Sequence, residues 1–221
     1  MEPSFRDRRD AGRLLAASLG HLDGDPALLV LGLPRGGVPV AAEVASALGA
    51  ALDVYLVRKL GVPGRRELAM GAIASGGVRV LNNRVAAGIS PAVVERVTRE
   101  EERELERCER ALRGGLPGPA VGGRTVILVD DGIATGSTMR SAISALRAAG
   151  AGRIVVAVPV AAPVTCRELE AEVEQVVAVV TPEPMTAISL WYDDFSQTAE
   201  EEVRALLEHA ARGGCEYPAP P

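Results

Sequence analysis

The chain has 221 residues, of which 48% are hydrophobic and 24% are charged, and its formal net charge is −5. A chain of this length and composition can bury the core of one soluble domain, so we treat residues 1–221 as a single domain. The net negative charge argues against sequence-independent binding of nucleic acid, which needs a concentrated basic surface. The amino terminus, residues 1–13, has no apolar core of signal-peptide length, and no later apolar run approaches a membrane span, so we expect a cytoplasmic protein without a membrane partner.

Three cysteines and two histidines show none of the spacings typical of disulfide frameworks, zinc sites or histidine-based catalysis. Lysine is more informative, because Lys59 is the one lysine among 24 basic residues. A strong excess of arginine over lysine usually reflects genome composition, and the single lysine then needs no functional explanation. The alternative is that position 59 needs a compact ammonium group.

Apolar runs alternate with helical patterns along the chain, as expected for an α/β domain with a mainly parallel, twisted sheet flanked by helices. The expected strands, buried on both faces, are residues 28–31, 52–57, 126–129, 154–160 and 176–180. The expected crossover helices are residues 38–48, 139–149 and 163–173. Gly49 and Gly150 stand where a helix ends in a left-handed cap. A longer helix is expected from its N-cap Ser90 to Arg113, and residues 213–221 are expected to form a flexible tail.

Residues 126–138 combine a buried strand with two features that suit a phosphorylated ligand. Asp130 and Asp131 follow the strand at its carboxyl end, where ligands bind in open α/β sheets. The next residues lead into a helix, so that backbone N–H groups, hydroxyls and the helix dipole can converge on a phosphate. These phosphate-loop candidates are Ala134, Thr135, Gly136, Ser137 and Thr138.

Each half of this segment has a plain alternative, an Asp-Asp-Gly turn and an ordinary helix cap. The two halves together are harder to explain that way. Two acids beside a phosphate site repel the phosphate and each other unless sugar hydroxyls or Mg²⁺ partner them. A nucleotide P-loop does not fit, because its GxxxxGK[ST] spacing is missing.

The segment resembles the signature of type I phosphoribosyltransferases. The resemblance implies that Asp130 and Asp131 hold the ribose hydroxyls of 5-phosphoribosyl-1-pyrophosphate (PRPP) and help to retain Mg²⁺, largely through water and ligand. It implies a catalytic role for Asp131 and places the 5-phosphate of PRPP on residues 134–138. It also implies a small hood, formed by variable segments, over the acceptor.

An earlier turn, Leu33-Pro34-Arg35-Gly36-Gly37, follows the first expected strand. Its glycines permit positive φ and close backbone approach, and Arg35 could meet an anion. The alternative is a tight turn with an exposed arginine. The resemblance implies that Arg35, Gly36 and Gly37 bind pyrophosphate. This loop would lie beside residues 130–138 if the two preceding strands are neighbours in the sheet.

Arg58 and Lys59 precede a stretch of loop composition with dense positive charge. Such a segment could fold over bound pyrophosphate and exclude water, although it could also be a basic surface loop. The resemblance implies a mobile catalytic loop here, which we assign to residues 58–77. Arg58 and Lys59 are then the expected stabilisers of pyrophosphate.

Three of the six aromatic residues fall in residues 191–195, within an expected hood at 182–198. Aromatic faces can stack on a planar acceptor while a carboxylate accepts its N–H groups, so Trp191, Tyr192 and Asp194 are candidate acceptor-binding residues. A local hydrophobic plug is the alternative.

The chain as a whole resembles a bacterial group of phosphoribosyltransferases whose acceptor is unsettled. The shared motifs are residues 5–8, 33–37, the Arg58-Lys59 loop and residues 191–195. Ala134 stands where the hypoxanthine-guanine branch carries aspartate, which makes a 6-oxopurine acceptor less consistent with the chain than an adenine-like or uracil-like one.

The resemblance implies Mg²⁺-dependent transfer of a phosphoribosyl group to a nitrogenous, nucleobase-like acceptor in nucleotide metabolism. Two alternatives remain open: a non-catalytic regulator that senses PRPP, and a hydrolase of a phosphorylated sugar. A homodimer is the default expectation for oligomeric state.

Overall fold

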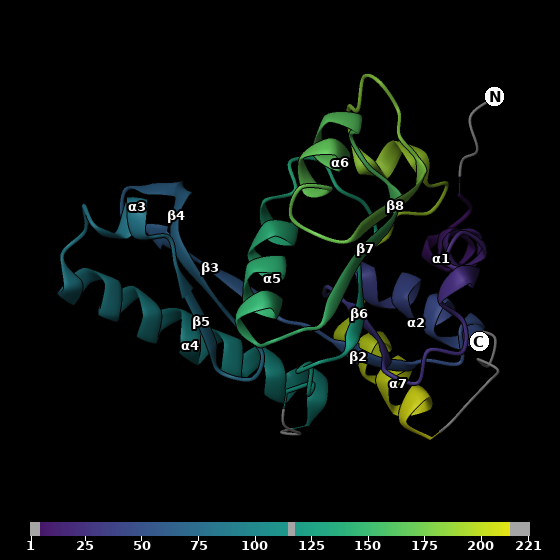
Figure 1. Ribbon diagram of the computed structural model, residues 1–221, viewed down its shortest axis with the longest axis horizontal. Coiled ribbons are helices and arrows are strands. Elements are labelled where there is room, and N and C mark those ends of the chain that lie inside the picture. Colours follow the sequence, from purple (N-terminus) through teal and green to yellow (C-terminus); the bar gives the residue numbers. More distant parts are fainter. Residues whose placement is uncertain (1–4, 115–117, 213–221) are drawn as a thin grey trace.

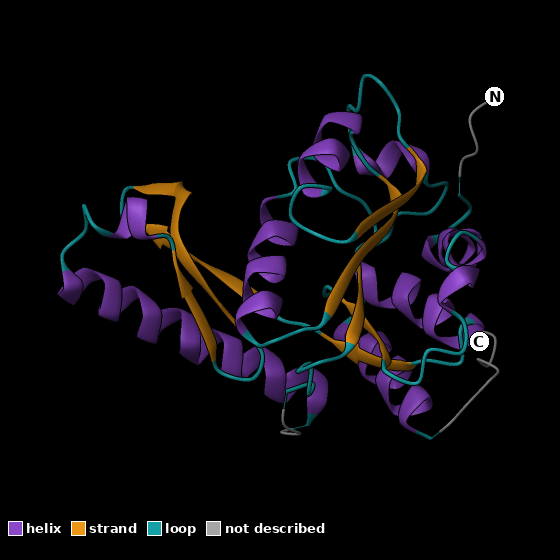
Figure 2. Ribbon diagram, in the orientation of Figure 1, coloured by secondary structure: helices purple, strands orange, loops and turns teal. Residues whose placement is uncertain are grey.

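The computed structural model describes residues 5–114 and 118–212, and its centre is a five-stranded sheet (Figures 1 and 2). The strand order is β2-β1-β6-β7-β8, and every pairing in it is parallel. The strands are β1 (Leu28–Gly32), β2 (Ala51–Val54), β6 (Thr125–Val129), β7 (Arg153–Val160) and β8 (Gln175–Val180). The predicted α/β fold with a mainly parallel sheet is confirmed.

Helices cover both faces of this sheet. Helices α1 (Arg8–Ala17) and α2 (Gly37–Ala47) pack on one face, and α5 (Ser137–Ala148) and α6 (Pro163–Leu169) pack on the other. The inner strands β1, β6 and β7 are almost wholly buried, as their runs of Leu, Val and Ile predict. The prediction of burial on both faces is wrong for β2 and β8, which are only partly buried because they are the edges of the sheet.

The predicted crossover helices are confirmed with shifted ends, and α6 stops at Leu169 rather than at residue 173. Gly49 and Gly150 have φ of 58° and 79°, so both occupy the predicted left-handed positions. The sequence did not predict α1, the short α3 (Asn83–Ala86) or α7 (Glu200–Ala211), and α7 lies beside α2, α4 and β2. Short 3-10 turns, η1 (Gly20–Leu22) and η2 (Ile188–Trp191), complete this part of the fold.

Residues 57–113 form an arm that extends away from the parallel sheet (Figure 1). It contains an antiparallel sheet of β3 (Val57–Val62), β4 (Arg65–Ala74) and β5 (Val78–Leu81), followed by α3 (Asn83–Ala86) and α4 (Pro91–Arg113). Ser90 is the N-cap of α4 and Pro91 its first residue, as predicted. The apolar stripe of α4 packs against buried side chains of β3 and β4.

Residues 58–77, assigned above to a mobile catalytic loop, are not a loop in conformation, because they form most of β3, all of β4 and the turns of two hairpins. They turn at Pro63-Gly64 and at residues 75–77, where Gly64, Gly76 and Gly77 have positive φ. The expected strand 52–57 is likewise broken, since β2 ends at Val54 and β3 begins at Val57. Glycines and charges obscured an alternation of buried residues that runs through Leu60 and Val62. Mobility of this segment stays a prediction.

Among the described residues, no helix combines the length and apolar character that a membrane crossing needs. The expected tail at 213–221 lies outside the described residues.

Candidate functional site

Two loops meet at the carboxyl edge of the parallel sheet. Strands β1 and β6 are neighbours, with Gly32 opposite Val129. The loop after β1 is tied to the end of β6 by a hydrogen bond of 2.8 Å from Leu33 N to the carbonyl oxygen of Val129. The prediction that residues 33–37 and residues 130–138 lie side by side is therefore confirmed.

The glycines of the first loop allow this close approach. A Cβ atom on Gly36 would overlap Oδ2 of Asp131, and one on Gly37 would lie 2.6 Å from the carbonyl oxygen of Val129. Neither glycine needs positive φ: Gly36 has φ of −63°, and Gly37 is the first residue of α2. The expectation of positive φ is corrected, whereas the expectation of close backbone approach is confirmed.

Replacing Gly36 by alanine should lower the free energy of unfolding by about 1–3 kcal/mol, the usual effect of an added methyl group in a packed site. Thermal or denaturant unfolding measures this change. Gly20→Ala is the matched control, because a Cβ on Gly20 meets no atom within 4 Å. Equal stability of the two variants would contradict the close packing of Gly36.

The second loop presents exposed groups at the start of α5. Ala134, Thr135, Ser137 and Thr138 are exposed, and Gly136 caps the helix with φ of 71°. The first backbone N–H groups of this 12-residue helix have no partner within the helix, and they belong to a segment with exposed side chains. This arrangement suits an anion, as the sequence predicts.

Thr165 of α6 supports the phosphate loop from behind, a role that the sequence did not reveal. Its buried hydroxyl donates to the carbonyl oxygen of Ala134 at 2.7 Å. Its methyl group fills the space beside Gly136, where an added Cβ would lie 2.8 Å from Thr165 Cγ2. Thr165 therefore fixes the loop conformation from a different helix.

Asp130 and Asp131 stand between the two loops. Oδ1 of Asp130 accepts a hydrogen bond of 2.9 Å from the backbone N–H of Asp131. Burial and repulsion by Asp131 raise the pKa of Asp130 well above its ordinary value. Burial also raises the pKa of Asp131, but the neighbouring Arg8 guanidinium opposes this rise. Two crowded carboxylates with this electrostatic cost are consistent with a ligand-binding role.

Arg8 is a site residue that sequence reasoning placed only in a shared motif. Its Nε and Nη2 both lie 2.8 Å from Oδ2 of Asp131. The side chains of Arg8 and Asp131 are 12% and 15% exposed, so the pair is largely shielded from solvent. Arg8, the first residue of α1, therefore connects this helix to Asp130 and Asp131, which we call the acidic pair.

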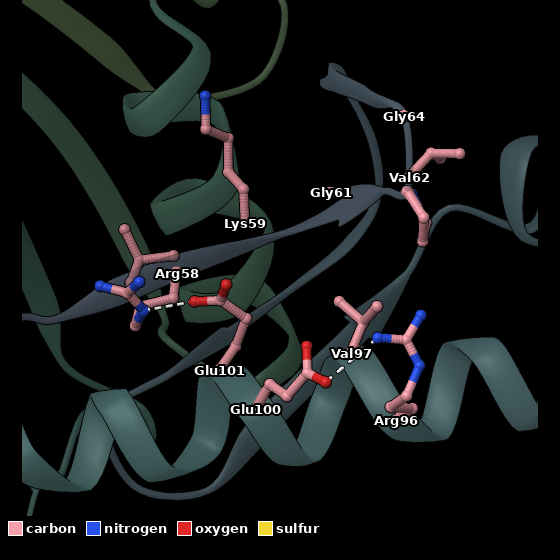
Figure 3. A pocket seen from close by; sticks show the side chains of 11 residues that line it. Arg58, Lys59, Gly61, Val62, Gly64, Arg96, Val97, Glu100 and Glu101 are labelled. Atoms are coloured by element: carbon pink, nitrogen blue, oxygen red, sulfur yellow. Dashed lines mark hydrogen bonds and ion pairs between the residues drawn. The ribbon is translucent and has the colours of Figure 1, made fainter.

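Lys59 and Arg58 leave β3 on opposite sides, as successive strand residues do (Figure 3). Nζ of Lys59 donates to Oγ of Ser137 at 3.2 Å, so this lysine reaches the phosphate loop. Arg58 turns to α4, where its Nε lies 2.5 Å from Oε2 of Glu101. Both residues line a groove of about 680 Å³ between the first hairpin and α4.

Arg58 also borders a second cavity. This cavity of about 290 Å³ is lined by Arg35 and Thr138 as well, so it adjoins both loops of the site. Of the predicted pyrophosphate residues, the structure therefore brings Lys59 to the phosphate loop and holds Arg58 in an ion pair nearby.

Tyr192 packs as the hydrophobic-plug alternative predicts. It is 6% exposed and lies between Phe5 and Phe195, with ring centroids at 5.3 Å and 5.1 Å. Its hydroxyl donates to the carbonyl oxygen of Asp131 at 2.6 Å, which ties the predicted hood to the acidic pair. Trp191 is half-buried and Asp194 is exposed, with its carboxylate accepting from Ser196 N at 2.8 Å. Acceptor binding at this segment stays a prediction.

Comparisons with known proteins agree with this geometry. The family model for the phosphoribosyl transferase domain matches residues 8–186. Two curated relatives from Mycobacterium tuberculosis, strains CDC 1551 and H37Rv, are provisionally named phosphoribosyl transferases. Each is 46% identical over 210 residues, which cover 94% of this chain and 47% of the relative. The chain thus spans about half the length of these curated relatives.

A solved structure matches almost end to end. The crystal structure of TT1426 from Thermus thermophilus has 45% sequence identity and a TM-score of 0.85 with this chain. The match covers 92% of this chain and 97% of that one. The chain therefore shares its fold over most of its length with a protein of known structure.

Proposed function

Because this chain belongs to the phosphoribosyltransferase family, we propose that it transfers a phosphoribosyl group from PRPP to a nitrogenous, nucleobase-like acceptor. The observation that carries the proposal is the convergence of three features on one sheet edge. They are the exposed start of α5, the acidic pair and the ammonium group of Lys59, which lies 3.2 Å from Ser137 Oγ.

Each part of PRPP has candidate partners at this sheet edge. The N–H groups at the start of α5 and the hydroxyls of Thr135, Ser137 and Thr138 would hold the 5-phosphate. The carboxylates of Asp130 and Asp131 would accept hydrogen bonds from the ribose hydroxyls. The loop at residues 33–37 would bind pyrophosphate beside them, because β1 and β6 are neighbours.

The reaction needs stabilisation of a departing anion more than it needs a nucleophile from the protein. The lone pair of the acceptor nitrogen forms a bond to C1 as the bond between C1 and the pyrophosphate oxygen breaks. The bonding electrons leave with pyrophosphate, and the proton displaced from nitrogen passes to water. Cationic side chains such as Lys59 and Arg35 favour this charge separation when they contact the leaving group.

Magnesium fits the acidic pair only together with the substrate. Among the described residues, no group of three or more His, Cys, Asp or Glu side chains could hold a metal ion. Mg²⁺ commonly binds through one or two carboxylates, substrate phosphates and water, so Asp130 and Asp131 would hold it with PRPP. When bound, the ion neutralises charge on the pyrophosphate group.

The proposal is tested by incubating the protein with PRPP, Mg²⁺ and a panel of nucleobases while pyrophosphate is measured. We expect release that depends on one class of base, with adenine-like and uracil-like bases tested first because of Ala134. Release without any base would instead indicate a hydrolase. Binding without release would indicate a regulator that senses PRPP.

Thr165→Val should weaken PRPP binding about five- to tenfold, because the loss of one buried hydrogen bond releases the carbonyl group of Ala134. Isothermal calorimetry with PRPP and Mg²⁺ measures the affinity. Thr165→Ser is the matched control, since it keeps the hydroxyl group and should bind nearly as the native protein does. Equal affinities for the two variants would exclude this positioning role.

A further inference from the structure

Arg8 touches three separate parts of the molecule with one side chain. Nε and Nη2 meet Oδ2 of Asp131, and Nη1 donates to the carbonyl oxygen of Ser196 at 2.6 Å. The guanidinium lies over the ring of Phe195, with Cζ 4.1 Å from the ring centroid. One cation therefore joins the acidic pair to residues 191–196, which we call the hood segment.

Within the described residues, the hood segment has no other direct anchor on the carboxylate of Asp131. Tyr192 reaches only the carbonyl oxygen of Asp131. Other hood contacts do not involve this carboxylate: Phe5 N donates to Trp191 O at 2.8 Å, and Asp193 N donates to Phe5 O at 2.8 Å. The hood rings also share an apolar cluster with Ala11 of α1 and Val160 of β7. The path from the Asp131 carboxylate to the hood thus passes through Arg8.

Arg8 contacts one oxygen of the Asp131 carboxylate. Both nitrogens of Arg8 use Oδ2, so Arg8 does not occupy Oδ1. The pair is also confined from the side of the first loop, because a Cβ on Gly36 would overlap Asp131 Oδ2 and lie 3.0 Å from Arg8 Nε. A sugar hydroxyl that binds Asp131 would therefore contact an ion pair that is packed against Gly36 and cannot shift toward that residue.

We propose that Arg8 is a positioning residue that links occupancy of the sugar site at Asp131 to the conformation of the hood segment. The inference rests on the proposed function, because it takes the ribose hydroxyls of PRPP as the ligand of Asp131. A guanidinium suits this task, since its fork and flat face serve three partners at once, whereas an ammonium group is a single point charge. The hood then adopts its acceptor-ready arrangement in response to bound sugar.

The chain contains its own reporter for this linkage. Trp191 is the sole tryptophan and lies in the hood segment, beside the backbone of Phe5. PRPP with Mg²⁺ is titrated into the protein while calorimetry measures binding and fluorescence measures the emission of Trp191. We expect both a heat of binding and a change in emission at the same ligand concentrations.

Arg8→Lys separates the two signals. The lysine keeps a cation near Asp131, so PRPP affinity should fall by no more than about tenfold. It cannot also hold Ser196 and Phe195, so the emission change should be lost. Phe195→Leu provides a second variant: it leaves the pair of Arg8 and Asp131 in place and should also reduce the emission change with nearly native affinity.

Arg6→Gln is the matched control, because Arg6 is a neighbouring exposed arginine that pairs with Asp10 and not with the site. It should show the native heat and the native emission change. The inference is overturned if native protein binds with heat but without an emission change, or if Arg8→Lys and Phe195→Leu both keep the native change. Loss of the change in Arg6→Gln would also overturn the assignment to Arg8. Absence of any heat with native protein would refute the proposed function itself.

Discussion

Asp130→Asn is expected to weaken binding of PRPP with Mg²⁺ at least tenfold, by about 1.5–3 kcal/mol, because a charged hydrogen-bond acceptor is lost. The same variant should unfold at a higher temperature at neutral pH. Burial and the charge of Asp131 raise the pKa of Asp130, so its ionised form destabilises the folded protein. Asparagine removes that charge and keeps an oxygen for the N–H of Asp131.

The pH dependence of this stability gain follows from the sign of the pKa shift. Above the folded pKa, native Asp130 is ionised in both the folded and the unfolded state, and asparagine gives its full gain. Below the unfolded pKa of about 3.9, Asp130 is protonated in both states and the gain disappears. Thermal unfolding of both proteins between neutral and acidic pH measures the difference. A gain that is the same at all pH values, or a lower stability throughout, would contradict this account.

Asp131→Asn provides the contrast. It should weaken ligand binding as well, but its gain in unfolding free energy should be smaller than that of Asp130→Asn, because the ion pair with Arg8 offsets part of the cost of burying the Asp131 charge. Unequal stability effects with similar binding effects would show that the two acids differ in structural environment rather than in ligand chemistry. Equal stability effects would mean that Arg8 contributes little to the fold.

The sequence identified the parts of the site that are contiguous along the chain. Residues 126–138 carry their own strand, acids and helix start, so their local pattern already fixes which sheet edge they occupy. The buried strands β1, β6 and β7 were predictable for a similar reason, since runs of Leu, Val and Ile fit only the interior of a parallel sheet. The sequence alone could not establish that β1 and β6 are neighbours in the sheet, because strand order depends on contacts between distant segments.

The residues that were missed act across long separations in sequence. Arg8 lies 123 positions before Asp131, and Thr165 lies 31 positions after Ala134. Thr165 has no local pattern that distinguishes it from an ordinary helix threonine. Arg8 was noted only as part of the shared motif at residues 5–8, and nothing local to that motif assigned it a role. The hairpins of the arm were missed for a different reason: turns rich in glycine and a charged outer face resemble a loop when only one face of a strand is buried.

Lys59→Ala is expected to lower kcat about 10²- to 10³-fold, the usual effect of removing one donor that stabilises charge developing in the transition state. The affinity for PRPP should fall less than about tenfold, because the ground state keeps the N–H groups of α5 and the hydroxyls of the phosphate loop. Pyrophosphate release with an accepted nucleobase gives kcat, and calorimetry gives the affinity. The position of Nζ, 3.2 Å from Ser137 Oγ, supports this separation of the two effects.

Arg58→Ala is the matched comparison, because the two residues are adjacent on β3 and face opposite sides (Figure 3). Arg58 is held by Glu101, so its loss should reduce kcat less than the loss of Lys59 does. A loss as large as that of Lys59→Ala would mean that Arg58 leaves Glu101 when the ligand binds, and the arm must then move during turnover. If Lys59→Ala kept the native kcat, this lysine would have no role in the reaction. The presence of a single lysine at position 59 would then have no catalytic explanation.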